Sequence, residues 1–65
     1  GHRHLIDEVR RRSRAVDLSI EALADAARVS RSQLWRILRG ECSPPVETLA
    51  ALADALGCRV RDLLP

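Results

Sequence analysis

Apolar residues recur along the chain at the spacing of helices, and no segment alternates apolar and polar positions as a strand does. This periodicity, together with capping residues at the ends of the apolar runs, predicts five helices with short connections. They cover residues 3–15, 19–27, 30–39, 45–56 and 60–64. A chain of 65 residues has room for one hydrophobic core. We therefore expect residues 1–65 to form a single, compact, all-α domain.

The second and third predicted helices have well-marked ends. Ser19 and Ser30 are good N-cap residues, and Gln33 follows Ser30 at the spacing of a capping box. Gly40 ends the third helix, because glycine readily takes the left-handed conformation that closes a helix. Only residues 28–29 remain between the two helices, which predicts a sharp turn.

The other helices are predicted from apolar stripes. The first helix has the stripe Leu5, Val9 and Val16. The fourth helix has Val46, Leu49, Leu52, Ala53 and Leu56, and the last has Val60, Leu63 and Leu64. Pro44-Pro45 lead into the fourth helix, where proline is tolerated in the first turn, and Gly57 ends it. We expect the apolar residues of the last helix to be core rather than interface.

The third predicted helix separates two kinds of side chain. On a wheel of ~100° per residue, the apolar face consists of Leu34, Ile37 and Leu38. The opposite, polar face consists of Ser32, Arg36 and Arg39. Residues 28–40 contain four arginines and no acid. Two short helices joined by a tight turn form a helix-turn-helix, whose second helix enters the major groove of DNA. Ordinary surface helices also carry charge, but arginine without acid beside such a turn favours DNA binding.

The chemistry of other function classes is missing from the sequence. It has no glycine-rich phosphate loop and no nucleophile–base pair, so we expect neither an enzyme nor a cofactor. His2, His4, Cys42 and Cys58 have a spacing that fits no zinc pattern. We expect the cysteines to be reduced thiols of a cytosolic protein rather than a disulfide. No apolar run approaches the ~20 residues needed to span a membrane.

Residues 5–64 resemble the phage-repressor and Cro-like helix-turn-helix family. The resemblance is strongest in VSRSQLWRILRG and VETLAALADALG, which look like that family's recognition helix and fourth helix. It implies a repressor-like domain of five helices, in which helices 2 and 3 form the helix-turn-helix. The residues it assigns to the core of the motif are Ala24, Val29, Leu34 and Ile37.

The resemblance also implies which residues meet DNA. The base-contacting candidates are Arg31, Ser32, Gln33, Trp35 and Arg36, and the phosphate-contacting candidates are Ser19, Arg39 and Ser43. Arginine presents a planar fork that can bond both O6 and N7 of guanine. Among the base-contacting candidates we therefore place the arginines first, Arg36 before Arg31. Either residue could instead hold a phosphate, which positions the protein without specifying a base. Ser32 could contact base or phosphate, or neither. Gln33 could serve only the capping box or could touch a base or phosphate. Trp35 could pack over the core edge or lie against a thymine methyl or sugar in the groove.

Five positions depart from the family pattern. Arg28 stands where glycine is frequent in the turn, and Ile20 stands where glutamine often holds a phosphate. Ser13 and Leu38 occupy the positions of an arginine–glutamate ion pair, so both of its ends are absent together. An apolar substitute for a buried pair is often neutral or stabilising. Glu41 replaces a basic residue and would oppose nearby phosphates.

We expect a transcriptional regulator that binds double-stranded DNA sequence-specifically as a homodimer on a two-fold site. Dimer contacts would come from the fourth and fifth helices or from a domain beyond residue 65. The expected location is the cytoplasm, in a bacterial or phage nucleoid-associated protein, without a membrane. The alternative, motivated by Ile20 and Glu41, is a protein-interaction adaptor or antitoxin module that uses the same fold.

Overall fold

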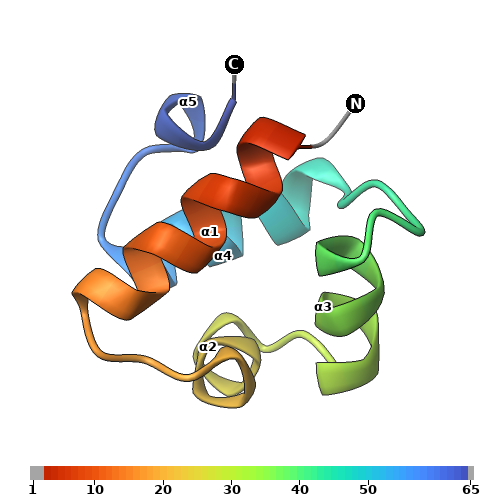
Figure 1. The fold of residues 1–65 in the computed structure, drawn as a ribbon, viewed down its shortest axis with the longest axis horizontal. Helices are drawn as coiled ribbons and strands as arrows, with labels where there is room; N and C mark the ends of the chain where they lie inside the picture. Colours follow the sequence, from red (N-terminus) through yellow and green to blue (C-terminus); the bar gives the residue numbers. More distant parts are fainter. Residues whose placement is uncertain (1–2, 65) are drawn as a thin grey trace.

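A computed structural model describes residues 3–64 of the chain and contains five helices and no strand in that range (Figure 1). The helices are α1 (Arg3–Ala15), α2 (Ile20–Ala27), α3 (Arg31–Leu38), α4 (Val46–Leu56) and α5 (Val60–Leu63). Ser19, Ser30 and Pro45 are N-cap residues immediately before the helices that we expected them to begin. The predicted all-α fold is confirmed.

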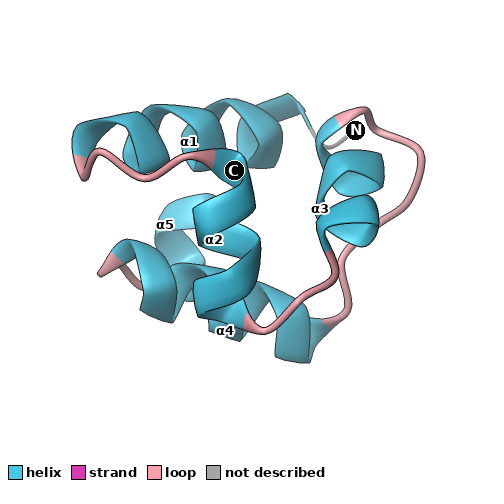
Figure 2. Cartoon of the chain, turned by 90° about the horizontal axis from the view of Figure 1, so that it is seen from below, coloured by secondary structure: helices cyan, strands magenta, loops and turns pink. Residues whose placement is uncertain are grey.

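The helices enclose one core to which each of them contributes. The side chains that are 0% exposed come from all five helices: Val9, Leu23, Ala24, Leu34, Leu52 and Leu63. α4 packs against α1, α2 and α5, and α3 packs against α2. Both views place α3 at one edge of the molecule (Figures 1 and 2). Its outer surface is therefore open to a partner, while its inner surface belongs to the core.

Four of the five helices end in the same type of reversal. Each is followed by a residue with positive φ: Asp17 (59°), Arg28 (58°), Gly40 (76°) and Gly57 (72°). After each, the next backbone N–H turns back to a carbonyl of the last helical turn, as in the 2.9 Å bonds from Val29 to Ala24 and from Cys58 to Ala53. These bonds satisfy carbonyls that helix ends otherwise leave unpaired. The connections can therefore be short.

Three apolar residues that we assigned to buried stripes are exposed. Val16 is 49% exposed because α1 has already ended at Ala15, so helical periodicity no longer fixes its direction. Val46, 76% exposed, is the first residue of α4. Leu64, 44% exposed, follows α5 in an extended conformation, which turns it away from the buried Leu63. All three lie at or just beyond the end of a helix, where periodicity is a poor guide.

In the part of the chain that the structure describes, no helix combines the length and the apolar character needed to cross a membrane.

We predict that Gly57→Ala lowers the free energy of unfolding by about 0.5–1 kcal/mol. A Cβ atom at Gly57 would meet nothing within 4 Å, so the cost is conformational. Left-handed strain of about 1–2 kcal/mol is offset in part by about 0.4–1 kcal/mol from a stiffer unfolded chain. Urea unfolding followed by circular dichroism measures the difference.

Arg28→Gly is the matched experiment, and it should change stability in the opposite direction. Arg28 has nearly the same conformation, with φ of 58° against 72° at Gly57. Glycine at residue 28 should therefore raise the free energy of unfolding by about 0.5–1 kcal/mol, from the same balance of strain and chain entropy. Destabilisation by both substitutions would contradict this account of the helix ends.

Candidate nucleic-acid interface

The turn between α2 and α3 is built from local backbone chemistry. Arg28 takes the left-handed conformation, and its N–H and that of Val29 bond to α2 carbonyls at 3.2 and 2.9 Å. The Ser30 Oγ then accepts a hydrogen bond from the Gln33 N–H at 3.0 Å, which is the serine half of the predicted capping box. Two helices and a sharp turn with these features form a helix-turn-helix.

α3 separates its side chains as the sequence predicts. Leu34, Ile37 and Leu38 are at most 4% exposed and form its underside. The residues exposed on and just after the helix include Arg31, Ser32, Arg36 and Arg39. Arg31, Arg36 and Arg39 have side chains that are 59%, 60% and 59% exposed. Nothing in the described part of the chain covers this arginine face.

Two polar contacts join the outer sides of α2 and α3. The Trp35 indole N–H donates to the Glu21 carboxylate at 3.2 Å, and Arg31 binds Asp25 through Nη2 at 2.8 Å and Nε at 3.4 Å. Each helix supplies two residues that lie four positions apart, which is about one helical turn. The two contacts between the helices therefore lie one turn apart. Both contacts join α3 to α2, and the half-buried bond from Trp35 is the less exposed of the two.

Trp35 is half-buried and packs against the core. Its only polar hydrogen is used by Glu21. The first of the two interpretations, packing over the core edge, describes its place in this structure, and contact with a base stays a prediction.

The arginines of α3 and its C-cap are paired with acids of the same chain. The hydrogen bonds from Arg31 lower the pKa of the Asp25 carboxyl. Glu41 lies 2.8 Å from the Arg39 Nε and 3.9 Å from the Arg36 Nε. Such exposed pairs contribute little stability and exchange readily. The arginines therefore remain available to a stronger anion.

The remaining site candidates lie around α3. Ser32 is exposed, and Gln33 is half-buried. Ser19 is exposed, and its Oγ caps α2 by accepting from the Ala22 N–H at 3.0 Å. Ser43 is exposed in the loop between α3 and α4. Base and phosphate contacts by these residues stay predictions.

An open hollow of about 430 Å³ lies where α1 passes into α2. It is lined by Arg10, Ser13, Arg14, Asp17, Leu18, Ser19 and Ile20. Arg10 and Arg14 were not among the predicted site residues. Their spacing of four on one helix, just before a capping serine, is the signal that sequence reasoning missed. Both arginines line the same hollow as Ser19.

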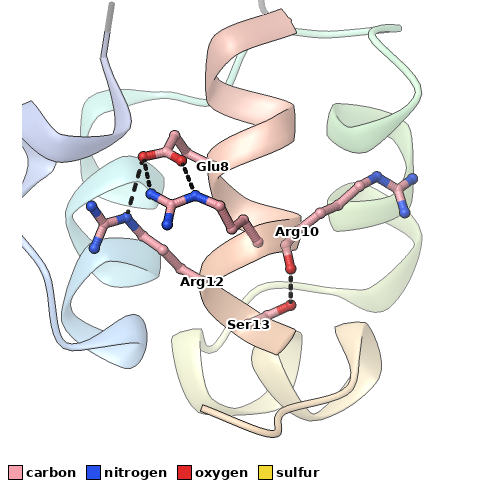
Figure 3. Close-up of polar contacts among 5 residues, drawn as sticks. Glu8, Arg10, Arg12 and Ser13 are labelled. Carbon is pink, nitrogen blue, oxygen red and sulfur yellow. Dashed lines mark hydrogen bonds and ion pairs between the residues drawn. The ribbon is translucent and has the colours of Figure 1, made fainter. Parts of the chain in front are cut away.

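The other arginines of α1 have a different role. Figure 3 shows Glu8 and Arg12 on one side of α1 and Arg10 extending from the opposite side. Glu8 accepts two hydrogen bonds from Arg11, at 2.7 and 2.8 Å, which lower the pKa of the Glu8 carboxyl, and it lies 3.6 Å from the Arg12 Nε. Arg11 and Arg12 thus pair within α1, so the arginine-rich end of this helix is not one continuous basic surface.

The two positions at which the resemblance to phage repressors would place an ion pair are both buried. Ser13 is 3% exposed and Leu38 is 4% exposed. The Ser13 hydroxyl donates to the Arg10 carbonyl of its own helix at 3.2 Å. Replacing the pair therefore leaves neither a buried charge nor a buried hydroxyl without a partner.

Neither the cysteines nor the histidines form a metal site in the described residues. No three side chains of His, Cys, Asp or Glu come together there as metal ligands, and His2 lies outside that range. Cys42 and Cys58 are free thiols, and burial raises the pKa of Cys58.

A family model described as "Helix-turn-helix domain" matches residues 4–65. The chain belongs to this helix-turn-helix family. Comparison with curated proteins and with solved structures finds no significant match. The match covers nearly the whole chain, and it supports the family as a whole rather than the phage-repressor and Cro-like subtype.

We predict that Glu21→Ala lowers the free energy of unfolding of the helix-turn-helix domain by about 1 kcal/mol. It removes the acceptor of a half-buried indole N–H, and a typical hydrogen bond contributes about 0.5–1.5 kcal/mol. Trp35→Phe and the double variant complete a double-mutant cycle, measured by urea unfolding and circular dichroism. If the changes in the free energy of unfolding of the two single variants simply add in the double variant, the Trp35–Glu21 contact does not couple α2 to α3.

Proposed function

We propose that this helix-turn-helix domain binds double-stranded DNA sequence-specifically as part of a transcriptional regulator, with α3 in the major groove. The observation that carries the proposal is the arginine face of α3. Arg31, Arg36 and Arg39 are exposed, while the opposite face of the helix is locked into the core. A rigid helix that presents exposed arginines matches both the width of the groove and the chemistry of its guanines.

Arg36 is the strongest candidate for reading a base. The nearest ion-pair contact of its side chain is at Nε, 3.9 Å from Glu41, which is too long for a hydrogen bond. The guanidinium can therefore turn its fork toward O6 and N7 of guanine. Arg31 already commits Nε and Nη2 to Asp25. It would have to break that contact to use the same fork, which supports the ranking of Arg36 before Arg31. Ser32, Gln33 and Trp35 complete the proposed base-contacting set.

Phosphate contacts are assigned to residues around the ends of the helices. Arg39 follows the last residue of α3, away from the N-terminal end that leads into the groove. Ser19 lies at the start of α2, where backbone N–H groups favour an anion, with Arg10 and Arg14 lining the same hollow. Ser43, in the loop after α3, is the third such residue. One domain of this size contacts few phosphates, so we propose a dimer on a two-fold site.

The direct test is a titration of the domain with random-sequence duplex DNA at two salt concentrations, followed by Trp35 fluorescence. We expect binding at low salt that weakens as salt rises, because each neutralised phosphate releases counterions. Trp35 is a suitable probe because it sits beside Arg31 and Arg36 on α3 and is held by Glu21.

A domain that gives no response at low salt, and no shift in an independent gel assay, would not be a DNA-binding domain. The adaptor or antitoxin function would then replace the proposal.

Two variants distinguish base contact from phosphate contact: Arg36→Ala tests the base contact, and Arg39→Ala tests the phosphate contact. We expect Arg36→Ala to cost about 1–3 kcal/mol on a site selected from random duplexes and to relax the base preference at one position. Arg39→Ala should weaken selected and random duplexes alike and reduce the salt slope by about one. Equal, sequence-independent losses for both variants would contradict the assignment.

A further inference from the structure

The backbone brings Glu41 back beside the end of α3. Gly40 has φ of 76°, which reverses the chain after Arg39. The Glu41 N–H then bonds to the Arg36 carbonyl at 2.9 Å, so the residue is tied to the last turn of the helix. The position of Glu41 is therefore set by the helix end and does not depend on its own side chain.

The Glu41 carboxylate lies between two arginines of the proposed reading surface. One oxygen is 2.8 Å from the Arg39 Nε and the other is 3.9 Å from the Arg36 Nε. Glu41 is 49% exposed, so its charge remains close to any phosphate that approaches α3. In both pairs the nearest contact of the carboxylate is with Nε, the guanidinium nitrogen nearest the chain.

We infer that Glu41 is a specificity-determining positioning residue, which acts on DNA through Arg36 and Arg39. This inference rests on the proposed DNA binding. Glu41 holds the Nε side of Arg36 while the terminal nitrogens meet a guanine, so the pair survives in the complex with the correct site. On a random duplex, binding depends on phosphates. Arg36 must then leave Glu41 to reach them, and the free carboxylate repels the same phosphates.

Asp25 has a different relation to its arginine. It binds Arg31 through two nitrogens at 2.8 and 3.4 Å, which occupies one side of the guanidinium fork in any complex. Glu41 instead divides one carboxylate between two arginines, and its nearest contact with each is at Nε. Only this arrangement penalises sequence-independent binding while leaving base reading intact.

The experiment compares Glu41→Gln with Asp54→Asn on a selected site and on random duplex over a range of salt. Both substitutions remove one exposed negative charge, but Asp54 lies in the C-terminal part of α4, away from the loop that joins α4 to α3. We expect Glu41→Gln to tighten random-duplex binding about three- to tenfold and to steepen its salt slope by about one. Affinity for the selected site should change less than about twofold relative to Asp54→Asn.

The ratio of selected to random affinity decides the inference. Equal ratios in Glu41→Gln and Asp54→Asn, or a larger ratio in Glu41→Gln, would overturn it even though the domain binds DNA. A parent domain that binds neither duplex would overturn the proposed function and this inference together. These two failures are distinguished by the binding of the parent domain alone.

A second readout does not require DNA. The Nε–Hε resonance of Arg39 should shift in nuclear magnetic resonance spectra of Glu41→Gln and stay in place in Asp54→Asn. An Arg39 resonance that is unchanged by Glu41→Gln would show that the pair does not exist in solution, which overturns the inference. The backbone bond of Glu41 is kept in the variant, so its circular dichroism and melting temperature should match those of the parent.

Discussion

The structure depends on the burial of one face of every helix in a shared core. Val9, Leu23, Leu34, Leu52 and Leu63 are all 0% exposed, and each comes from a different helix. In a domain of this size no helix is stable without the others. Because the buried face of α3 is part of this core, its opposite face is held rigidly at the edge of the molecule. A rigid edge helix is what a groove-reading function requires.

On the exposed face of α3, acidic side chains partly neutralise the arginines. Two acids, Asp25 and Glu41, lie against the three arginines on and just after α3. The local basic excess is therefore smaller than the arginine count in this segment of sequence suggests. A modest excess limits attraction to phosphate in general. Under the proposed function, selectivity would come from the placement of individual guanidinium groups more than from total charge.

Helix number, type and approximate position were predictable because they depend on local chemistry. Ser19 and Ser30 cap the helices that follow them, and Gly40 and Gly57 take the left-handed conformation after helices. The aliphatic face of α3 was also visible in its periodicity, because a helix that packs on a core repeats its apolar positions at helical spacing. Periodicity was misleading only near helix ends, where Val16, Val46 and Leu64 are exposed.

The sequence alone determined the five helices, their caps, and which face of α3 carries arginine, since each of these follows from neighbours a few positions apart. Only the tertiary structure decided the partners of the polar side chains. The bond from Trp35 to Glu21 joins residues on different helices, and Arg10 and Ser19 line one hollow across the α1–α2 turn. Such contacts depend on how helices cross, and crossing is set by the packing of the whole core.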